Sequence, residues 1–151
     1  MLIRKYDPSK KAEVRELVLG VLQEHGFEYD RLKDSDLKDI ENYYFKKGGC
    51  FFVGLSETGQ LMGTSAVRNI NSQRCEIRRI YLKKEYRGKG YGKKLFLKAL
   101  DFAETNYSSA HLKTDASLSK AINMYLKEGF IYLKEESKYL YFEKEFAEKK
   151  V

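Results

Sequence analysis

The order of apolar and polar residues along the chain predicts an alternation of strands and helices. Residues 2–6 predict a short first strand, and Asp7-Pro8 follows it as a helix start, because Asp caps free N–H groups and Pro fits the first helical turn. A weaker helical pattern over residues 36–45 predicts a second helix, which Gly48-Gly49 ends. Between them, apolar residues at helical spacing predict an amphipathic helix with one buried face, made of Val14, Leu17, Val18, Val21 and Leu22.

The rest of the pattern begins with strands and ends with a hairpin. Residues 50–55 and 61–70 predict two strands joined by a polar turn that contains Gly59, and residues 75–82 predict a further strand. The later elements are predicted in this order: an amphipathic helix around residues 95–103, a strand over 110–114, a helix over 119–128 closed by Gly129, and a hairpin of 130–133 with 139–146. This order indicates a mixed α/β fold, and we expect residues 1–151 to form a single domain.

Composition narrows the class of protein. The 151 residues are 42% hydrophobic, which is enough for one substantial core. Charges at residues 4–7 stand where a signal peptide needs apolar side chains, and no apolar run reaches the length of a membrane span, so we expect a cytoplasmic protein without a membrane partner. Cys50 and Cys75 lack a C-x-x-C spacing, and neither His25 nor His111 joins them in a zinc motif. The sequence therefore predicts no metal site.

Most of the positive charge lies in one segment. The net charge is +7, and residues 83–98 contain seven basic side chains against one acidic side chain, Glu85. Charge concentrated in a short, glycine-containing stretch favours a compact polyanion over a long nucleic-acid track, so a nucleic-acid partner is not expected. Two other interpretations stay open: a solvated basic helix face, or nucleic-acid binding in which nearby tyrosines stack on bases, namely Tyr81, Tyr86 and Tyr91.

Three alternating glycines carry the main functional signal. Gly88, Gly90 and Gly92 permit unusual φ values and close approach of the backbone, so several N–H groups can converge on one anion at a helix N-terminus. A Walker A loop needs Ser or Thr where Lys94 stands, and a Rossmann fingerprint needs Gly where Lys93 stands. The segment therefore predicts a phosphate site, and the spacing favours neither an NTP nor a dinucleotide.

The same segment fits the pattern Arg-x-x-Gly-x-Gly through Arg87, Gly90 and Gly92, between a strand and an amphipathic helix. In this it resembles the pyrophosphate loop of the GNAT superfamily of acetyltransferases. A second motif, residues 121–130, resembles that family's later helix, with Tyr125 near its end and a Gly-Phe pair after it. The resemblance implies a GNAT-like fold with a central, mostly antiparallel sheet flanked by helices. It also implies an N-acetyltransferase that uses acetyl-CoA and a primary amine of a small molecule or peptide, and family habit allows a homodimer.

The resemblance also indicates where the coenzyme would bind. In the family, the strand before the loop diverges from its neighbour, so the N–H groups of Ile80 and Leu82 would meet the pantetheine arm and polarise the thioester. The alternative is an ordinary ladder strand. The implied contacts lie at the end of this strand and along the loop: Ile80, Tyr81, Leu82, Arg87, Gly88, Lys89, Gly90, Tyr91, Gly92 and Lys93.

Two side chains are candidates for proton transfer. Tyr125 is the candidate general acid for the leaving thiolate, and with pKa values of about 10 for a phenol and about 8.5 for a thiol this transfer is uphill by about 2 kcal/mol. Glu76 is the candidate base that takes a proton from the substrate ammonium, directly or through water. Each has a structural alternative: Tyr125 in the core beside Ala121 and Ile122, and Glu76 in an ion pair with Arg78 or a neighbouring strand.

Several questions stay open at this level. Family members that acetylate protein N-termini often carry Asn and Glu where this chain has Leu118 and Lys113, which weakens a role in ribosomal-protein acetylation. A non-catalytic module that senses acyl-CoA is the main alternative to an enzyme, and the presence of Tyr125 favours the enzyme. By resemblance the acceptor lies near residues 28–45 and 132–139, where no motif identifies it, and the transferred acyl group is not fixed as acetyl.

Overall fold

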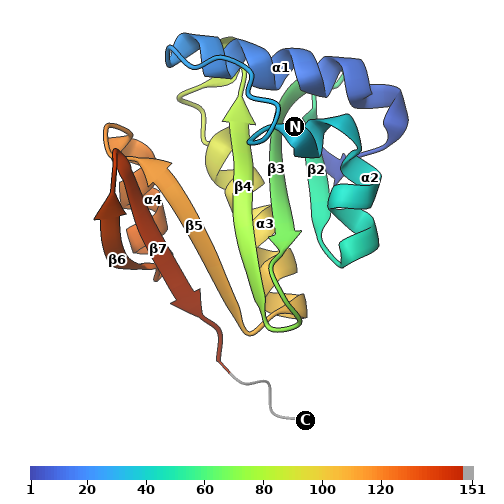
Figure 1. The fold of residues 1–151 in the computed structure, drawn as a ribbon. Coiled ribbons are helices and arrows are strands. Elements are labelled where there is room, and N and C mark those ends of the chain that lie inside the picture. The colour runs from blue at the N-terminus through green and yellow to red at the C-terminus, as the bar shows by residue number, and fades with distance from the viewer. Residues whose placement is uncertain (148–151) are drawn as a thin grey trace.

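The computed structural model describes residues 1–147 and contains a seven-stranded sheet in the order β1-β2-β3-β4-β5-β7-β6 (Figure 1). Neighbouring strands are antiparallel, except that β4 and β5 are parallel. The strands are β1 (Leu2–Lys5), β2 (Cys50–Leu55), β3 (Leu61–Asn69), β4 (Arg74–Leu82), β5 (Ser109–Asp115), β6 (Ile131–Glu136) and β7 (Tyr139–Glu145). The predicted α/β fold with a mostly antiparallel sheet is confirmed.

Helices cover the two faces of the sheet unequally (Figure 1). On one face, α1 (Lys11–Glu24) and α2 (Ile40–Tyr43) pack over the first strands, and on the other face lie α3 (Tyr91–Asn106) and α4 (Ser119–Lys127). The buried core under α1 and α2 contains no residue of β5, β6 or β7. These helices therefore leave one face of the last three strands uncovered.

The predicted second helix over residues 36–45 is wrong as a continuous helix. This segment folds as a 3-10 turn (Ser35–Lys38), the four-residue α2 and a second 3-10 turn (Phe45–Lys47). Asp36 points inward from the first turn and is only 1% exposed, and its carboxylate accepts hydrogen bonds from Arg79 and Tyr44. Contacts with a distant strand, not helical periodicity, therefore determine the path of this segment.

β4 carries a bulge at Arg79. Two register pairs flank the bulge, Thr64 with Tyr81 and Ala66 with Arg78. Between them β3 advances two residues while β4 spans three, so β4 has one extra residue. Arg79 has a φ of 57°, in the left-handed region, where a non-glycine residue costs roughly 1–3 kcal/mol. Such a conformation persists only where surrounding contacts enforce it.

The bulge changes the direction in which the side chains of β4 point. Arg78 and Arg79 are consecutive, yet both guanidinium groups approach the carbonyl oxygen of Lys33 at 3.5 Å, on the α2 side of the sheet. Ile77 and Ile80 both pack into the core under α3. In a regular strand these two isoleucines would lie on opposite faces, so the bulge reverses the alternation just before the glycine loop.

Candidate active site

β4 and β5 separate toward the end of the sheet at which β4 finishes (Figure 1). Their parallel ladder pairs only the first three residues of β4, Arg74 to Glu76, with Ser109 to His111 of β5. Beyond Glu76 the edge of β4 that faces β5 pairs with no strand of residues 1–147. The ordinary ladder strand considered as an alternative therefore ends at Glu76.

The unpaired edge of β4 presents the peptide groups of Ile80 and Leu82. On the other side, the N–H of Lys83 donates to the carbonyl oxygen of Met62 in β3 at 2.9 Å. Because successive peptide groups along a strand point in opposite directions, the N–H groups of Leu82 and Ile80 point away from β3 and toward the opening beside β5. The two groups predicted to meet the pantetheine arm thus lie on the edge that is free to bind a ligand.

The glycine loop leads from β4 into α3 with its own N–H groups unpaired. Gly88 and Gly90 have φ values of 80° and 84°, which glycine adopts without strain. Within residues 1–147, no N–H from residues 88–93 donates a hydrogen bond, and Lys94 is the first to do so, to the carbonyl of Gly90 at 3.2 Å. Consecutive free N–H groups at a helix N-terminus form an anion site. The loop therefore has the donors that a pyrophosphate needs.

Arg87 is anchored at the start of this loop. Its Nε donates to the carbonyl of Leu82 at 3.0 Å, and its Nη1 pairs with the carboxylate of Glu24 in α1 at 2.7 Å. The guanidinium therefore ties the end of β4 to α1 and shapes the turn from which the loop begins. Direct contact of Arg87 with the coenzyme stays a prediction.

Tyr125 has its ring in the core under α3 and its hydroxyl at the edge of that core. The ring centre lies 5.1 Å from that of Phe96 and 6.2 Å from that of Phe142. The hydroxyl bonds to no described residue, yet it is not one of the fully covered oxygens that lack a partner, so it keeps contact with solvent. Burial raises the pKa of Tyr125 to about 12, and nearby Tyr81 adds to this shift. The geometry of Tyr125 is thus compatible both with a general acid and with a residue that only packs in the core.

Glu76 sits between two arginines at the point where β4 and β5 separate. Its Oε1 accepts a hydrogen bond from Nε of Arg68 at 3.0 Å and lies 3.9 Å from Nε of Arg78. The ion pairs considered as the structural alternative are therefore present. They occupy one carboxylate oxygen, and the role of Glu76 as a base stays a prediction.

His111, for which the sequence predicts no role in metal binding, is a further polar side chain beside Glu76. It is the register partner of Glu76 across the β4–β5 ladder, and its Nε2 lies 3.3 Å from Oε1 of Glu143. This nitrogen is covered by protein and forms no hydrogen bond of good geometry with any residue that the structure describes. The signal in the sequence is weak: a histidine that alternates with the buried residues Ala110 and Leu112 along a strand.

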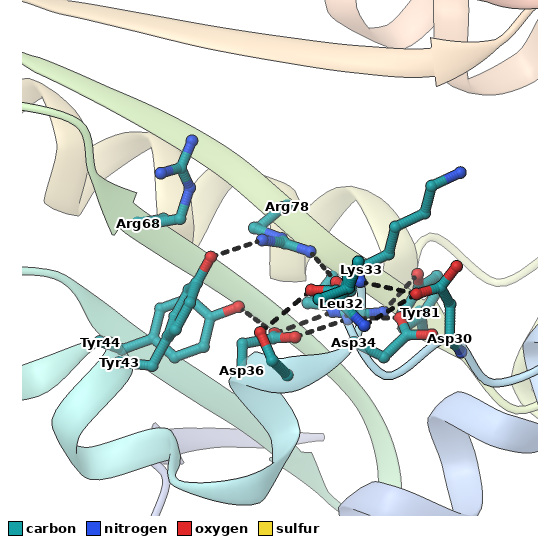
Figure 2. A network of polar contacts seen from close by, with 12 residues as sticks. Asp30, Leu32, Lys33, Asp34, Asp36, Tyr43, Tyr44, Arg68, Arg78 and Tyr81 are labelled. Atoms are coloured by element: carbon teal, nitrogen blue, oxygen red, sulfur yellow. Dashed lines mark hydrogen bonds and ion pairs between the residues drawn. The ribbon is translucent and has the colours of Figure 1, made fainter.

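A buried ion-pair network ties the bulge of β4 to the segment before α2 (Figure 2). Nη2 of Arg79 lies 2.8 Å from Asp34 and 2.7 Å from Asp36, and its Nε lies 3.0 Å from the second oxygen of Asp36. That oxygen also accepts a hydrogen bond of 2.5 Å from Tyr44. Burial acts to raise the pKa of Asp36, but the hydrogen bonds and charge of Arg79 outweigh it, so this pKa is lowered. Both partners are thus charged in the core.

An open cavity of about 570 Å³ lies on the face of β5 and β7 that α1 and α2 do not cover. It touches both regions in which the acceptor is expected, residues 28–45 and 132–139, and its volume is typical of a small-molecule site. Residues from the loop after α1, from β5 and from the β6–β7 hairpin line it: Phe27, Lys33, Lys113, Glu136, Ser137, Lys138, Tyr139 and Tyr141.

Comparison with known proteins identifies the family. Residues 17–130 match the sequence profile of the Acetyltransferase (GNAT) family. The chain belongs to the GNAT family of acetyltransferases. An N-acetylaspartate synthetase from Xenopus tropicalis is 42% identical to this GNAT chain over 99 residues, which make up 64% of this chain and 36% of that protein. The chain thus spans little more than a third of the length of this relative.

Solved structures show the same GNAT fold. An acetyltransferase from Streptococcus agalactiae superposes with a TM-score of 0.85 at 21% identity, over 96% of this chain and 98% of that one. The PaiA N-acetyltransferase from Thermoplasma acidophilum, solved in complex with coenzyme A, superposes with a TM-score of 0.74 at 20% identity, over 96% and 98% of the two chains. Within residues 1–147, no helix has the length and apolar character needed to cross a membrane, and no three His, Cys, Asp or Glu side chains gather as metal ligands.

Proposed function

We propose that this GNAT chain transfers the acetyl group of acetyl-CoA to a primary amine of a small molecule or peptide. The observation that carries this proposal is the run of free N–H groups at residues 88–93, next to the unpaired edge of β4. Backbone donors in the loop bind the pyrophosphate of the coenzyme, and the N–H groups of Ile80 and Leu82 bind the pantetheine arm and the thioester oxygen. When bound, the coenzyme supplies the activated acetyl group.

The proposed reaction needs two proton transfers. The amine nitrogen forms a bond to the acetyl carbon as the carbon–sulfur bond breaks, Glu76 takes a proton from the amine, and Tyr125 gives one to the thiolate. With the pKa of Tyr125 at about 12, protonation of a thiolate whose conjugate acid has a pKa of about 8.5 is uphill by roughly 5 kcal/mol. Tyr125 therefore acts in this scheme only if bound thiolate and phenol share a hydrogen bond that lowers this difference.

The test of the donor site compares two glycine substitutions of the same kind. Gly92→Ala adds a methyl group in open space at the start of α3, where φ is not positive, and should cover part of the anion site without straining the backbone. Gly20→Ala makes the same change in α1, also in open space, and serves as the matched control. Gly90 is less suitable, because its φ of 84° strains any side chain.

Calorimetric titration with coenzyme A should show at least a tenfold loss of affinity for Gly92→Ala and none for Gly20→Ala. Thiol release from acetyl-CoA, measured across a panel of amines, then tests turnover, and the name of the Xenopus relative puts aspartate in that panel. Binding of the coenzyme without thiol release from any amine would favour the acyl-CoA-sensing module. Equal affinity in all three proteins would reject the loop as the coenzyme site.

A further inference from the structure

The cavity on the open face of β5 and β7 carries positive charge that no ion pair within residues 1–147 neutralises. Lys33, Lys113 and Lys138 line it, and no carboxylate of residues 1–147 forms an ion pair with any of them. Glu136, the acidic residue of this lining, pairs instead with Lys134 at 3.1 Å. Three ammonium groups are therefore left to bind an anion.

Aromatic rings hold two of these ammonium groups at the cavity wall. Nζ of Lys138 lies 3.9 Å from the ring centre of Phe27, and Nζ of Lys113 lies 5.3 Å from that of Tyr139. Cation–π contacts orient an ammonium without cancelling its charge. Figure 2 shows the side chain of Lys33 extending away from the buried ion pairs, with no interaction drawn to its ammonium group.

A nearby carboxylate, that of Asp115, is engaged elsewhere. Its Oδ1 accepts hydrogen bonds from the N–H and the hydroxyl of Ser117 at 2.9 and 2.7 Å. These hydrogen bonds are the main reason that the pKa of Asp115 is lowered, and the charges of Lys138 and His25 contribute less. Asp115 forms no ion pair with Lys138 within residues 1–147, so it offsets the charge of this lysine only in part.

The charged wall lies close to the candidate base. Ala110 and Leu112 pack into the core under α3, so His111 and Lys113 point to the opposite, open face of β5. His111 is the register partner of Glu76, and Lys113 follows it by two residues, about 7 Å along the strand. If the amine of a substrate lies at Glu76, a carboxylate of the same substrate that is only a few bonds from the amine therefore lies within reach of Lys113.

We propose that this cavity selects an acceptor amine that bears carboxylates, as a short acidic amino acid does, and binds them through Lys33, Lys113 and Lys138. The inference rests on the proposed acetyl transfer and adds the charge and size of the acceptor. Charge-assisted hydrogen bonds of this kind are worth roughly tenfold to a hundredfold in affinity each. An acidic peptide N-terminus would satisfy the same lysines only if the cavity admits its chain.

The experiment compares aspartate, asparagine and putrescine, three acceptors of similar size that differ in charge, by thiol release from acetyl-CoA. We expect kcat/KM to be at least tenfold higher for aspartate than for asparagine, and lowest for putrescine. Lys113→Met should raise KM for aspartate roughly tenfold or more, but it should not raise KM for putrescine, because Lys113 repels the second ammonium group of that diamine. Lys11→Met, an equivalent change at an exposed lysine of α1, is the matched control.

A second measurement does not depend on turnover. Succinate has both carboxylates of aspartate but no amine, and calorimetry should show that it binds the wild type and binds Lys113→Met at least tenfold more weakly. If putrescine is turned over as well as aspartate and Lys113→Met does not change the affinity for succinate, the proposal of an anionic acceptor is overturned. The proposal of acetyl transfer is then unaffected. Succinate binding lost in Lys113→Met, without turnover of any amine, would support the anion site and overturn acetyl transfer. An acidic peptide preferred over free aspartate would overturn the small-molecule acceptor.

Discussion

Asp36→Asn removes one negative charge from the buried network and should destabilise the protein strongly. Asp36 is 1% exposed and receives two hydrogen bonds from Arg79, at 2.7 and 3.0 Å, and one from Tyr44. The amide keeps the shape but offers one oxygen where three donors converge, and its NH₂ group faces donors. Breaking a buried pair on one side typically costs about 3–5 kcal/mol, and in this variant Asp34 is the one remaining counter-charge of Arg79 among residues 1–147. For a domain of this size that corresponds to a fall in Tm of roughly 6–20 °C.

The pH dependence provides a second readout of the same network. Because the pKa of Asp36 is lowered in the folded protein, its contribution to stability is fully present above the unfolded pKa of about 3.9 and is lost as the pH falls through the folded value. The stability difference between the wild type and Asp36→Asn should therefore be constant near neutrality and shrink on acidification below about pH 4.

The assay is urea denaturation at several pH values, with Asp39→Asn as the control. Asp39 undergoes the same chemical change at an exposed helix cap, where its side chain accepts from the N–H of Asn42 at 3.1 Å and where Asn caps as well as Asp. We expect the control to stay within about 0.5 kcal/mol of the wild type. A loss below about 1 kcal/mol for Asp36→Asn at neutral pH would refute the claim that this network enforces the bulge.

Three further predictions concern the proposed catalytic groups. Tyr125→Phe should lower kcat by roughly 10²- to 10⁴-fold and nearly preserve coenzyme affinity, measured with an amine whose chemistry limits turnover. A kcat close to that of the wild type would show that Tyr125 serves only in packing. The pKa of Tyr125 is about 12 in the folded protein and about 10 in the unfolded chain. The free energy of unfolding should therefore fall by at most roughly 3 kcal/mol as the pH rises from about 10 to 12, and this fall should be absent in Tyr125→Phe. Glu76→Gln should lower kcat/KM mainly below the pKa of the acceptor amine, and an unchanged pH–rate profile would show that Glu76 serves only Arg68 and Arg78.

Local signals in the sequence were enough to predict much of this fold. The alternating glycines at 88, 90 and 92 mark the loop that leads into α3, because glycine adopts without strain the positive φ values found at two of them. The apolar stripe from Leu95 to Ala103 predicts α3, because one face of that helix packs against the sheet. Each of these signals acts within a few residues of the chain.

The remainder depends on contacts between distant segments. Asp36 and Arg79 are 43 residues apart, and neither the bulge nor the broken path of residues 36–45 follows from local periodicity. One hint is present in the sequence: the spacing of two places the charged Arg79 on the same strand face as the apolar residues Cys75 and Ile77, so it needs a buried counter-charge. The segment that supplies that charge cannot be read from periodicity. The three lysines that line the cavity beside β5 and β7 likewise come from three separate segments, and only the fold brings them together.

β4 extends well beyond the short ladder that pairs it with β5, so a small rotation at the ladder moves its far end. Three residue pairs join the two strands, and β4 then runs from Glu76 to Leu82 over about 20 Å, at roughly 3.3 Å per residue. Rotation of about 5° between the strands at this ladder moves the far end by roughly 1.7 Å, and displacements near 1 Å at a reacting centre can cost a hundredfold in rate. Cys75 lies in the middle of this ladder and is fully buried, with its Sγ 3.6 Å from the carbonyl of Ser109. We therefore expect a change in its volume to alter the angle between the two strands, and through that angle the distance from Leu82 to β5.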